Sequence, residues 1–354
     1  MMDKILTVLG VIGVPISVAG SIFHWSALIM FIVYCLTIIA LAAIIGRATE
    51  SLAIVMGPRI GGLLNATFGN AVELIISIFA LKAGLISIVL ASLTGSVLGN
   101  LLLVAGLSFF VGGLKYKRQS FNVQEAQHNA GLLIFAVIVA FVIPEVFTHT
   151  MNDQETMIIS VGISIILILL YLAALLFKFV THRGVYQNND KTNGSHQEEE
   201  NPEWGKIKAM VILAIATIAV AYVSEHLVDT FDVVGEAFGW SELFIGVIIV
   251  AIVGNAAEHA SAVIMAYKNK MEVAMEIAVG STLQVAMFVL PILVLLSLIF
   301  STSMSLVFTW PELISMVAAV LLMTILSNDG DSNWFDGAVL LSAYLIMGIG
   351  FYFV

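Results

Sequence analysis

The sequence has only one cysteine, Cys35, and only 11% charged residues, and both scarcities narrow the class of protein. A single cysteine cannot form an internal disulfide, and it excludes a cysteine-cluster metal site. Soluble proteins contain about 25% charged and roughly 45–50% apolar residues, whereas 60% of these 354 residues are hydrophobic and the mean hydropathy is +1.06. The composition therefore excludes a soluble enzyme, a disordered protein and a nucleic-acid binder. It indicates an integral membrane protein.

Long apolar runs account for most of the chain. A transmembrane helix needs about 20 apolar residues, and these runs are too long for barrel strands and lack their alternation. We therefore predict an all-α membrane protein with 11 transmembrane helices, at 5–23, 25–46, 60–81, 85–112, 128–147, 157–180, 206–228, 241–267, 273–299, 304–327 and 334–354. For the first of these, a cleaved signal peptide is the alternative, because small residues follow its apolar run.

The basic residues predict the orientation. Of the 14 Lys and Arg residues, all except Lys82 fall on the side of the membrane that holds the N-terminus. Because basic residues concentrate on the cytoplasmic side, we predict a cytoplasmic N-terminus and an outside C-terminus at Val354. In a bacterium the membrane would be the cell (plasma) membrane.

One motif occurs twice at a constant spacing. Gly-Asn-Ala-Val-Glu at 69–73 returns as Gly-Asn-Ala-Ala-Glu at 254–258, and Gly-Ser at 95–96 returns at 280–281, both with an offset of 185 residues. Each half then holds five predicted helices, and because five is odd, the second half is inverted. Secondary transporters are built from such inverted repeats, with the substrate site near the bilayer midplane.

The repeat and one polar segment divide the chain into four parts. These are a first transmembrane helix outside the repeat (1–24), a first five-helix repeat (25–180), an acidic cytoplasmic linker (181–205) and a second, inverted five-helix repeat (206–354). The linker contains the run from Glu198 to Glu203.

Each copy of the motif places a glutamate, Glu73 or Glu258, near the middle of a predicted span. A carboxylate at the bilayer centre costs at least about 3 kcal/mol, so it is a functional candidate by default. Two carboxylates related by pseudo-symmetry can share a divalent cation, which compensates both charges. A packing notch in a helix interface is the alternative explanation of each Gly-Asn pair.

The surrounding residue types favour a hard cation such as Ca²⁺, which takes six to eight oxygen ligands. The candidate metal ligands beside Glu73 and Glu258 are Asn70, Asn255, Ser96, Ser281 and Gln284, and Asn100 lies on the same predicted helix as Ser96. The absence of a cysteine or multi-histidine cluster argues against zinc or copper. We expect Gly69 and Gly254 to break their helices and free backbone carbonyls.

The same two glutamates predict proton coupling. A carboxyl group buried without a cation favours its protonated form, so a divalent cation and protons would compete for Glu73 and Glu258. His259, directly after Glu258, is the candidate to join the proton path.

The motifs Gly-Asn-Ala-Val-Glu-Leu-Ile, from Gly69, and Gly-Asn-Ala-Ala-Glu-His-Ala-Ser-Ala-Val, from Gly254, resemble the paired signature repeats of the cation/proton exchanger family. Within that Ca²⁺/cation antiporter superfamily, the chain looks most similar to bacterial Ca²⁺/H⁺ antiporters over nearly its whole length. The resemblance implies that Glu73 and Glu258 bind the cation and are alternately protonated. It also implies a role in cation access for the acidic stretch between the halves.

The sequence thus predicts a Ca²⁺/H⁺ antiporter that exports cytoplasmic Ca²⁺ by alternating access, with helices broken at both Gly-Asn sites. It is not an enzyme and needs no cofactor, because Ca²⁺ is the transported substrate. Its expected partners are Ca²⁺, H⁺ and the lipid bilayer, without nucleic acid. A homo-oligomer is compatible with the sequence, which does not decide the oligomeric state. A Na⁺/Ca²⁺ exchanger and, from a different class, a divalent-cation channel are the alternatives.

Overall fold

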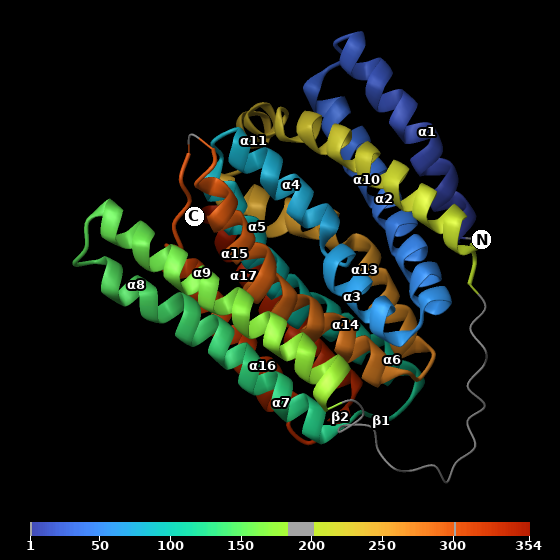
Figure 1. Ribbon diagram of the computed structural model, residues 1–354, viewed down its shortest axis with the longest axis vertical. Helices are drawn as coiled ribbons and strands as arrows, with labels where there is room; N and C mark the ends of the chain where they lie inside the picture. Colours follow the sequence, from blue (N-terminus) through green and yellow to red (C-terminus); the bar gives the residue numbers. More distant parts are fainter. Residues whose placement is uncertain (1, 183–201, 301) are drawn as a thin grey trace.

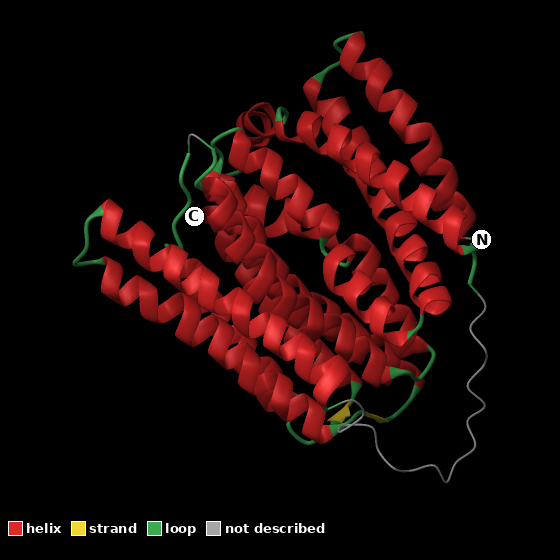
Figure 2. Ribbon diagram, viewed as in Figure 1, coloured by secondary structure: helices red, strands yellow, loops and turns green. Residues whose placement is uncertain are grey.

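The computed structural model describes residues 2–182, 202–300 and 302–354, and these form a bundle of helices (Figure 2). The first part of the chain forms α1 (Met2–Ile22), α2 (Ala27–Met56), α3 (Pro58–Phe68), α4 (Ala71–Lys82), α5 (Ile86–Leu98), the π-helical segment η1 (Gly99–Val104), α6 (Ala105–Lys115), the strand β1 (Gln119–Ser120), α7 (Val123–Ile134), η2 (Phe135–Val142), α8 (Ile143–Thr148), α9 (Asp153–Leu176) and η3 (Phe177–Thr181). The second part forms α10 (Lys206–Val228), α11 (Phe231–Phe238), α12 (Glu242–Phe244), η4 (Ile245–Val250), α13 (Ala251–Tyr267), α14 (Met271–Gln284), η5 (Val285–Val289), α15 (Leu290–Ser297), α16 (Trp310–Leu326), the strand β2 (Asp331–Ser332) and α17 (Trp334–Phe353).

Nine helices, or runs of joined helical segments, in the described parts of the chain are long and apolar enough to cross a membrane. Each falls on one of the predicted spans, so the helical membrane character is confirmed. Inside hydrocarbon a helix satisfies every backbone N–H and C=O within its own segment, which is why the apolar runs take this form. The acidic residues 198–200 of the predicted linker lie outside the described residues.

Two predicted spans differ from the structure. The span predicted at 304–327 yields the shorter helix α16, because residues 302–309 are not helical. In that segment the backbone N–H groups of Met304 and Leu306 bond to the hydroxyls of Ser297 and Ser160, each at 2.9 Å, in place of helix carbonyls. The span predicted at 60–81 is divided into α3 and α4.

The division between α3 and α4 lies at the first Gly-Asn pair. Asn70 has φ −100° and ψ 23°, outside helical geometry, and the N-cap position of α4 falls on it. The second pair behaves differently, because α13 runs without interruption through Gly254 and Asn255. The expected break at both Gly-Asn pairs is therefore right for the first and wrong for the second, where the wide π turn of η4 comes just before α13.

One short antiparallel strand pair departs from the all-helical prediction. Gln119 pairs with Ser332 and Ser120 with Asp331, which joins the α6–α7 connection to the α16–α17 connection. Hydropathy gave no signal for it, since two-residue strands carry no periodicity and the pairing is fixed by residues more than 200 positions apart.

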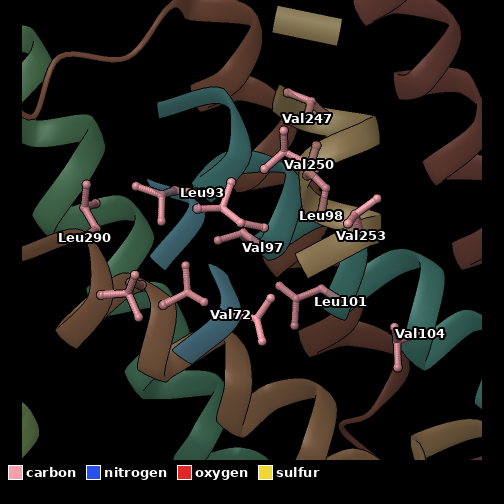
Figure 3. Close-up of a cluster of buried hydrophobic side chains, with 14 of the residues drawn as sticks. Val72, Leu93, Val97, Leu98, Leu101, Val104, Val247, Val250, Val253 and Leu290 are labelled. Carbon is pink, nitrogen blue, oxygen red and sulfur yellow. The ribbon is translucent and has the colours of Figure 1, made fainter. Parts of the chain in front are cut away.

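The helices pack in an order that places the two repeated motifs at the centre. In Figure 1, α1, α2 and α10 lie together on one side, and α7, α8, α9 and α16 lie on the other. The segments α4, α5, α13 and α14 occupy the middle. Figure 3 shows apolar side chains meeting in one cluster, which includes Val72 of α4, Val97 of α5 and Val253 of α13. Val72 and Val97 directly adjoin Glu73 and Ser96, so the core holds the polar residues in place.

Candidate cation site

Glu73 lies in the first turn of α4 and is buried, with 1% of its surface exposed. The hydroxyl of Ser96 on α5 donates a hydrogen bond to Glu73 Oε1. The other carboxylate oxygen, Oε2, has no hydrogen-bond partner among the described residues. A buried carboxylate oxygen without a partner is costly, so this oxygen is suited to a cation or a proton.

Glu258 on α13 has the equivalent partner in the second half. The hydroxyl of Ser281 on α14 lies 2.7 Å from Glu258 Oε2. Both serines follow their glutamate by 23 residues, and both sit on the next helix of the same half. Residues related by the offset of 185 positions therefore make equivalent contacts as well as being of the same type.

Each serine also contacts the asparagine of the opposite half. Asn255 Nδ2 donates a hydrogen bond of 2.9 Å to Ser96 Oγ, and Ser281 Oγ lies 3.0 Å from Asn70 Oδ1. All four side chains are at most 6% exposed. The structure thus brings the predicted serines, asparagines and glutamates of both halves into one buried polar cluster.

The motif glycines allow this close approach. A Cβ on Gly69 would lie 3.1 Å from Glu258 Oε1 and 3.4 Å from Gln284 Oε1. A Cβ on Gly254 would lie 3.6 Å from the Cβ of Glu73. Each glycine therefore faces the glutamate of the other motif, and the Gln284 side chain lies near that of Glu258.

The two halves of the cluster differ in their exposure. Glu73 is fully buried, whereas Glu258 is partly exposed. Near Glu258, Gly280 is exposed and a Cβ added to it would meet nothing within 4 Å, whereas its counterpart Gly95 packs directly against the backbone of Val247. The helix surface around Gly95 on α5 is therefore closely packed, whereas the equivalent surface around Gly280 on α14 is open.

His259 and Asn100 do not join the cluster through any contact of the described residues. The Cβ position of Gly99 lies 3.7 Å from His259 Cε1, and His259 Nε2 is buried without a hydrogen-bond partner. Adjacent residues on a helix point about 100° apart, so His259 faces η1 rather than the carboxylate of Glu258. Asn100 is likewise buried, with an unpartnered Nδ2.

The cluster is rich in oxygen and carries two carboxylates. Among the described residues no group of three or more His, Cys, Asp or Glu side chains is placed to hold a metal ion. Two carboxylates with amide and hydroxyl oxygens suit a hard cation that keeps part of its hydration, and they do not suit zinc or copper. Such a site can exchange one charged guest for another, because a bare pair of carboxylates is unstable in a low-dielectric interior.

Two buried carboxylates outside the cluster were missed as functional candidates. Glu312, which its sequence position near a span end marks as interfacial, is 2% exposed and forms the capping box of α16 with Thr309. Glu145 is 6% exposed and lies on α8. The available signal was that an ionisable residue within a membrane span is a functional candidate in itself.

A multi-pass helical bundle that gathers acidic, amide and hydroxyl side chains at its centre is the arrangement expected of an integral membrane transporter of cations and not of an enzyme. This chain belongs to the sodium/calcium exchanger protein family, which matches residues 26–180 and 208–353. The Ca²⁺/H⁺ antiporter ChaA of Bacillus subtilis (strain 168) is 70% identical over 351 residues, covering 99% of each chain. The Ca²⁺/H⁺ antiporter of Aphanothece halophytica is 44% identical over 96% of this chain and 94% of its own.

Solved structures show the same fold. The structure of native YfkE matches with a TM-score of 0.87 and 64% identity, covering 99% of this chain and 100% of that one. The H⁺/Ca²⁺ exchanger CAX matches with a TM-score of 0.76 at 14% identity, over 100% of this chain and 93% of that one, which shows the fold alone.

Proposed function

We propose that this protein is a Ca²⁺/H⁺ antiporter that exports cytoplasmic Ca²⁺ in exchange for protons. Glu73 and Glu258 bind Ca²⁺ and protons in turn. Neutral oxygens come from Asn70, Asn255, Ser96, Ser281 and Gln284. The observation that carries the proposal is the crossed arrangement in which each serine contacts the glutamate of its own half and the asparagine of the other. The activities named for the relatives above agree with it.

The proposal includes the full architecture predicted from the sequence. Eleven spans comprise a first helix (1–24) and two inverted five-helix repeats (25–180 and 206–354), joined by the acidic linker (181–205). The divided helix α3–α4 and the shorter α16 supply the two spans that are not among the nine long helices. The N-terminus lies in the cytoplasm, the C-terminus lies outside, and in a bacterium the membrane is the cell membrane.

Alternating access is supported by the difference between Gly95 and Gly280. Inverted halves that exchange conformations open one side of the site while the other is closed. The close packing of Gly95 on Val247 closes the side of η4, which is the outer side in the proposed orientation. Gly280 has open space around it and Glu258 is partly exposed, and we propose that the site opens there, on the cytoplasmic side in the proposed orientation. His259 takes part in the proton path only if the helix turns it toward Glu258.

Everted membrane vesicles test the function. Radioactive Ca²⁺ uptake after acidification of the vesicle interior should be abolished by Glu73→Gln and by Glu258→Gln. Glu236→Gln, which changes an exposed carboxylate on α11, is the matched control and should transport normally. Wild-type uptake in the Glu73→Gln protein would refute the assignment.

The same vesicles separate the alternatives. Uptake that follows a sodium gradient and ignores a pH jump would indicate a Na⁺/Ca²⁺ exchanger. Calcium current that outruns all coupled proton movement would indicate a channel.

A further inference from the structure

Glu145 is a carboxylate buried within a membrane-spanning run, and the transport site does not use it. It lies on α8, is 6% exposed, and its Oε2 has no hydrogen-bond partner among the described residues. Its neighbours Ile143, Val146 and Phe147 are 44–55% exposed. They form the outward, lipid-side surface of this helix, so Glu145 points into the protein.

Ring contacts on both sides of Glu145 fix what it faces. One turn before it, Phe141 packs on Phe308 with ring centroids 5.3 Å apart. One turn after it, His149 stacks on Trp310 at 6.2 Å. Residues i, i+4 and i+8 share one face of a helix, so Glu145 lies on the helix face whose rings pack on Phe308, just before α16, and on Trp310, its first residue. This end of the bundle, where α8 turns into α9 (Figure 1), is opposite to β1 and β2.

The charges around Glu145 leave one partner for it. The sequence has no Lys or Arg between Arg118 and Lys178, nor between Lys270 and the C-terminus, so α7, α8, α9 and α16 bring no fixed positive charge. On the helices α9 and α16, the titratable groups at this end are all acidic: Glu312 on α16, and the exposed Asp153 and Glu155 at the start of α9. His149 Nε2 lies 3.8 Å from Glu145 Oε1, and the His149 side chain is 59% exposed.

A buried carboxylate with no fixed cation nearby must be compensated by a proton. Glu145 and His149, 3.8 Å apart, are the two side chains here that can hold such a proton. The exposed His149 directly follows the apolar run that ends at Thr148, and Glu145 lies within that run, so in the proposed orientation the imidazole is the group of the pair nearer the outer surface.

The start of α16, on which His149 stacks, is linked to the helix that carries Ser96. Glu312, at the start of α16, accepts a hydrogen bond of 3.2 Å from Thr94 on α5, the helix that carries Ser96. A tightly packed apolar pocket, without room for a water molecule, lies between the two regions. Its walls include Phe141, one turn from Glu145, and also Val97 and Val285, the sequence neighbours of Ser96 and Gln284.

We propose that Glu145 and His149 form a second proton-binding site, at the outer end of the protein, which sets how exchange responds to the pH outside. The proposal rests on the proposed function. It adds a group that neither binds Ca²⁺ nor belongs to the repeated motifs, since the residue 185 positions after Glu145 is Gly330.

The test varies the pH inside everted vesicles, which corresponds to the outside, while the pH of the medium is held constant. For Glu145→Gln, we expect half-maximal Ca²⁺ uptake to require an internal proton concentration changed by at least about fivefold, as for a typical coupling between sites. The dependence on the pH of the medium and the KM for Ca²⁺ should not change. Glu145→Asp should restore the wild-type profile at least in part, and His149→Gln should shift it in the same direction as Glu145→Gln.

Asp153→Asn is the matched control, because it removes an exposed carboxylate at the same end, and its profile should equal that of the wild type. An infrared difference spectrum between two pH values supplies a readout apart from transport: a carboxylic-acid carbonyl band should be lost in Glu145→Gln. An unchanged internal-pH profile, or a uniform loss of rate without a shift, would overturn the proposal. Loss of all uptake in Glu73→Gln with an unchanged profile in Glu145→Gln would refute this inference and leave the proposed function intact.

Discussion

Asn255 on α13 donates a 2.9 Å hydrogen bond to Ser96 on α5, across 159 residues of sequence. Ser96 in turn donates to Glu73, so its single hydroxyl connects an amide of one half to a carboxylate of the other. An isolated helix pair would not need this contact. Asn255 thus helps to orient the Glu73 carboxylate through Ser96, in the way that supporting residues around a metal site position the ligands.

Removing this hydroxyl should weaken cation binding without unfolding the protein. For Ser96→Ala we expect the KM for Ca²⁺ to rise about tenfold, equivalent to about 1.4 kcal/mol, because Glu73 and Asn255 both lose a partner. Ser92→Ala is the matched control: Ser92 is equally buried one turn earlier, and its hydroxyl bonds only to Val89 O of the same helix. Equal KM values for the two variants would contradict the role of Ser96.

The open space at Gly280 predicts accessibility from one side of the membrane. In a Cys35→Ser background, which removes the only native thiol, Gly280→Cys should react with an impermeant maleimide added to the cytoplasmic face, and Ca²⁺ should slow the reaction. Ala278→Cys, at a position that is 0% exposed on the same helix, should stay unlabelled. Labelling of Gly280→Cys from the outer face alone would contradict the proposed orientation of the open side.

Close packing at Gly95 predicts a loss of stability on substitution. A Cβ at this position would collide with the backbone of Val247, so Gly95→Ala must separate α5 from η4. Overpacking of this kind costs about 1–3 kcal/mol, and the melting temperature of the purified protein in detergent should fall. Gly162→Ala on α9, where a Cβ meets nothing within 4 Å, should leave the melting temperature unchanged or slightly higher.

Gln119 in β1 and Arg118, which directly precedes it, should contribute unequally to the stability of the protein. Gln119 is 2% exposed, and its amide donates to Ala266 O and to Asn269 Oδ1, both at 2.9 Å. Gln119→Ala leaves these acceptors without the donor, and we expect a loss of about 1–3 kcal/mol in the free energy of unfolding.

Arg118 is the matched comparison, because its ion pair with Asp331 is exposed. The hydrogen bond to Asp331 and its negative charge raise the pKa of Arg118. A raised pKa leaves the guanidinium charged at every working pH, so whatever the pair contributes is constant with pH. Exposed ion pairs contribute little. Arg118→Ala should therefore leave the melting temperature unchanged at any pH between about 6 and about 9. A larger fall for Arg118→Ala than for Gln119→Ala would contradict this ranking.

The sequence by itself determined which segments enter the membrane and which polar residues they carry there. Hydrophobic runs make a helix obligatory in hydrocarbon, and the 185-residue offset pairs Glu73 with Glu258 before any coordinates are known. The same reasoning treats the two motifs as equivalents. It therefore predicted a break at both Gly-Asn pairs, although the structure breaks only the first.

Only the tertiary structure decided which face of each helix is buried and against what. The contacts of Ser96 with Asn255, of Gly95 with Val247 and of Phe141 with Phe308 all join residues far apart in the chain. Local patterns do not encode such contacts, because a residue within an apolar run can face lipid, core or a cavity with the same neighbours in sequence. The exposure difference between Glu73 and Glu258 has the same origin: nearly identical motifs lie in surroundings that the packing of the two halves makes unequal.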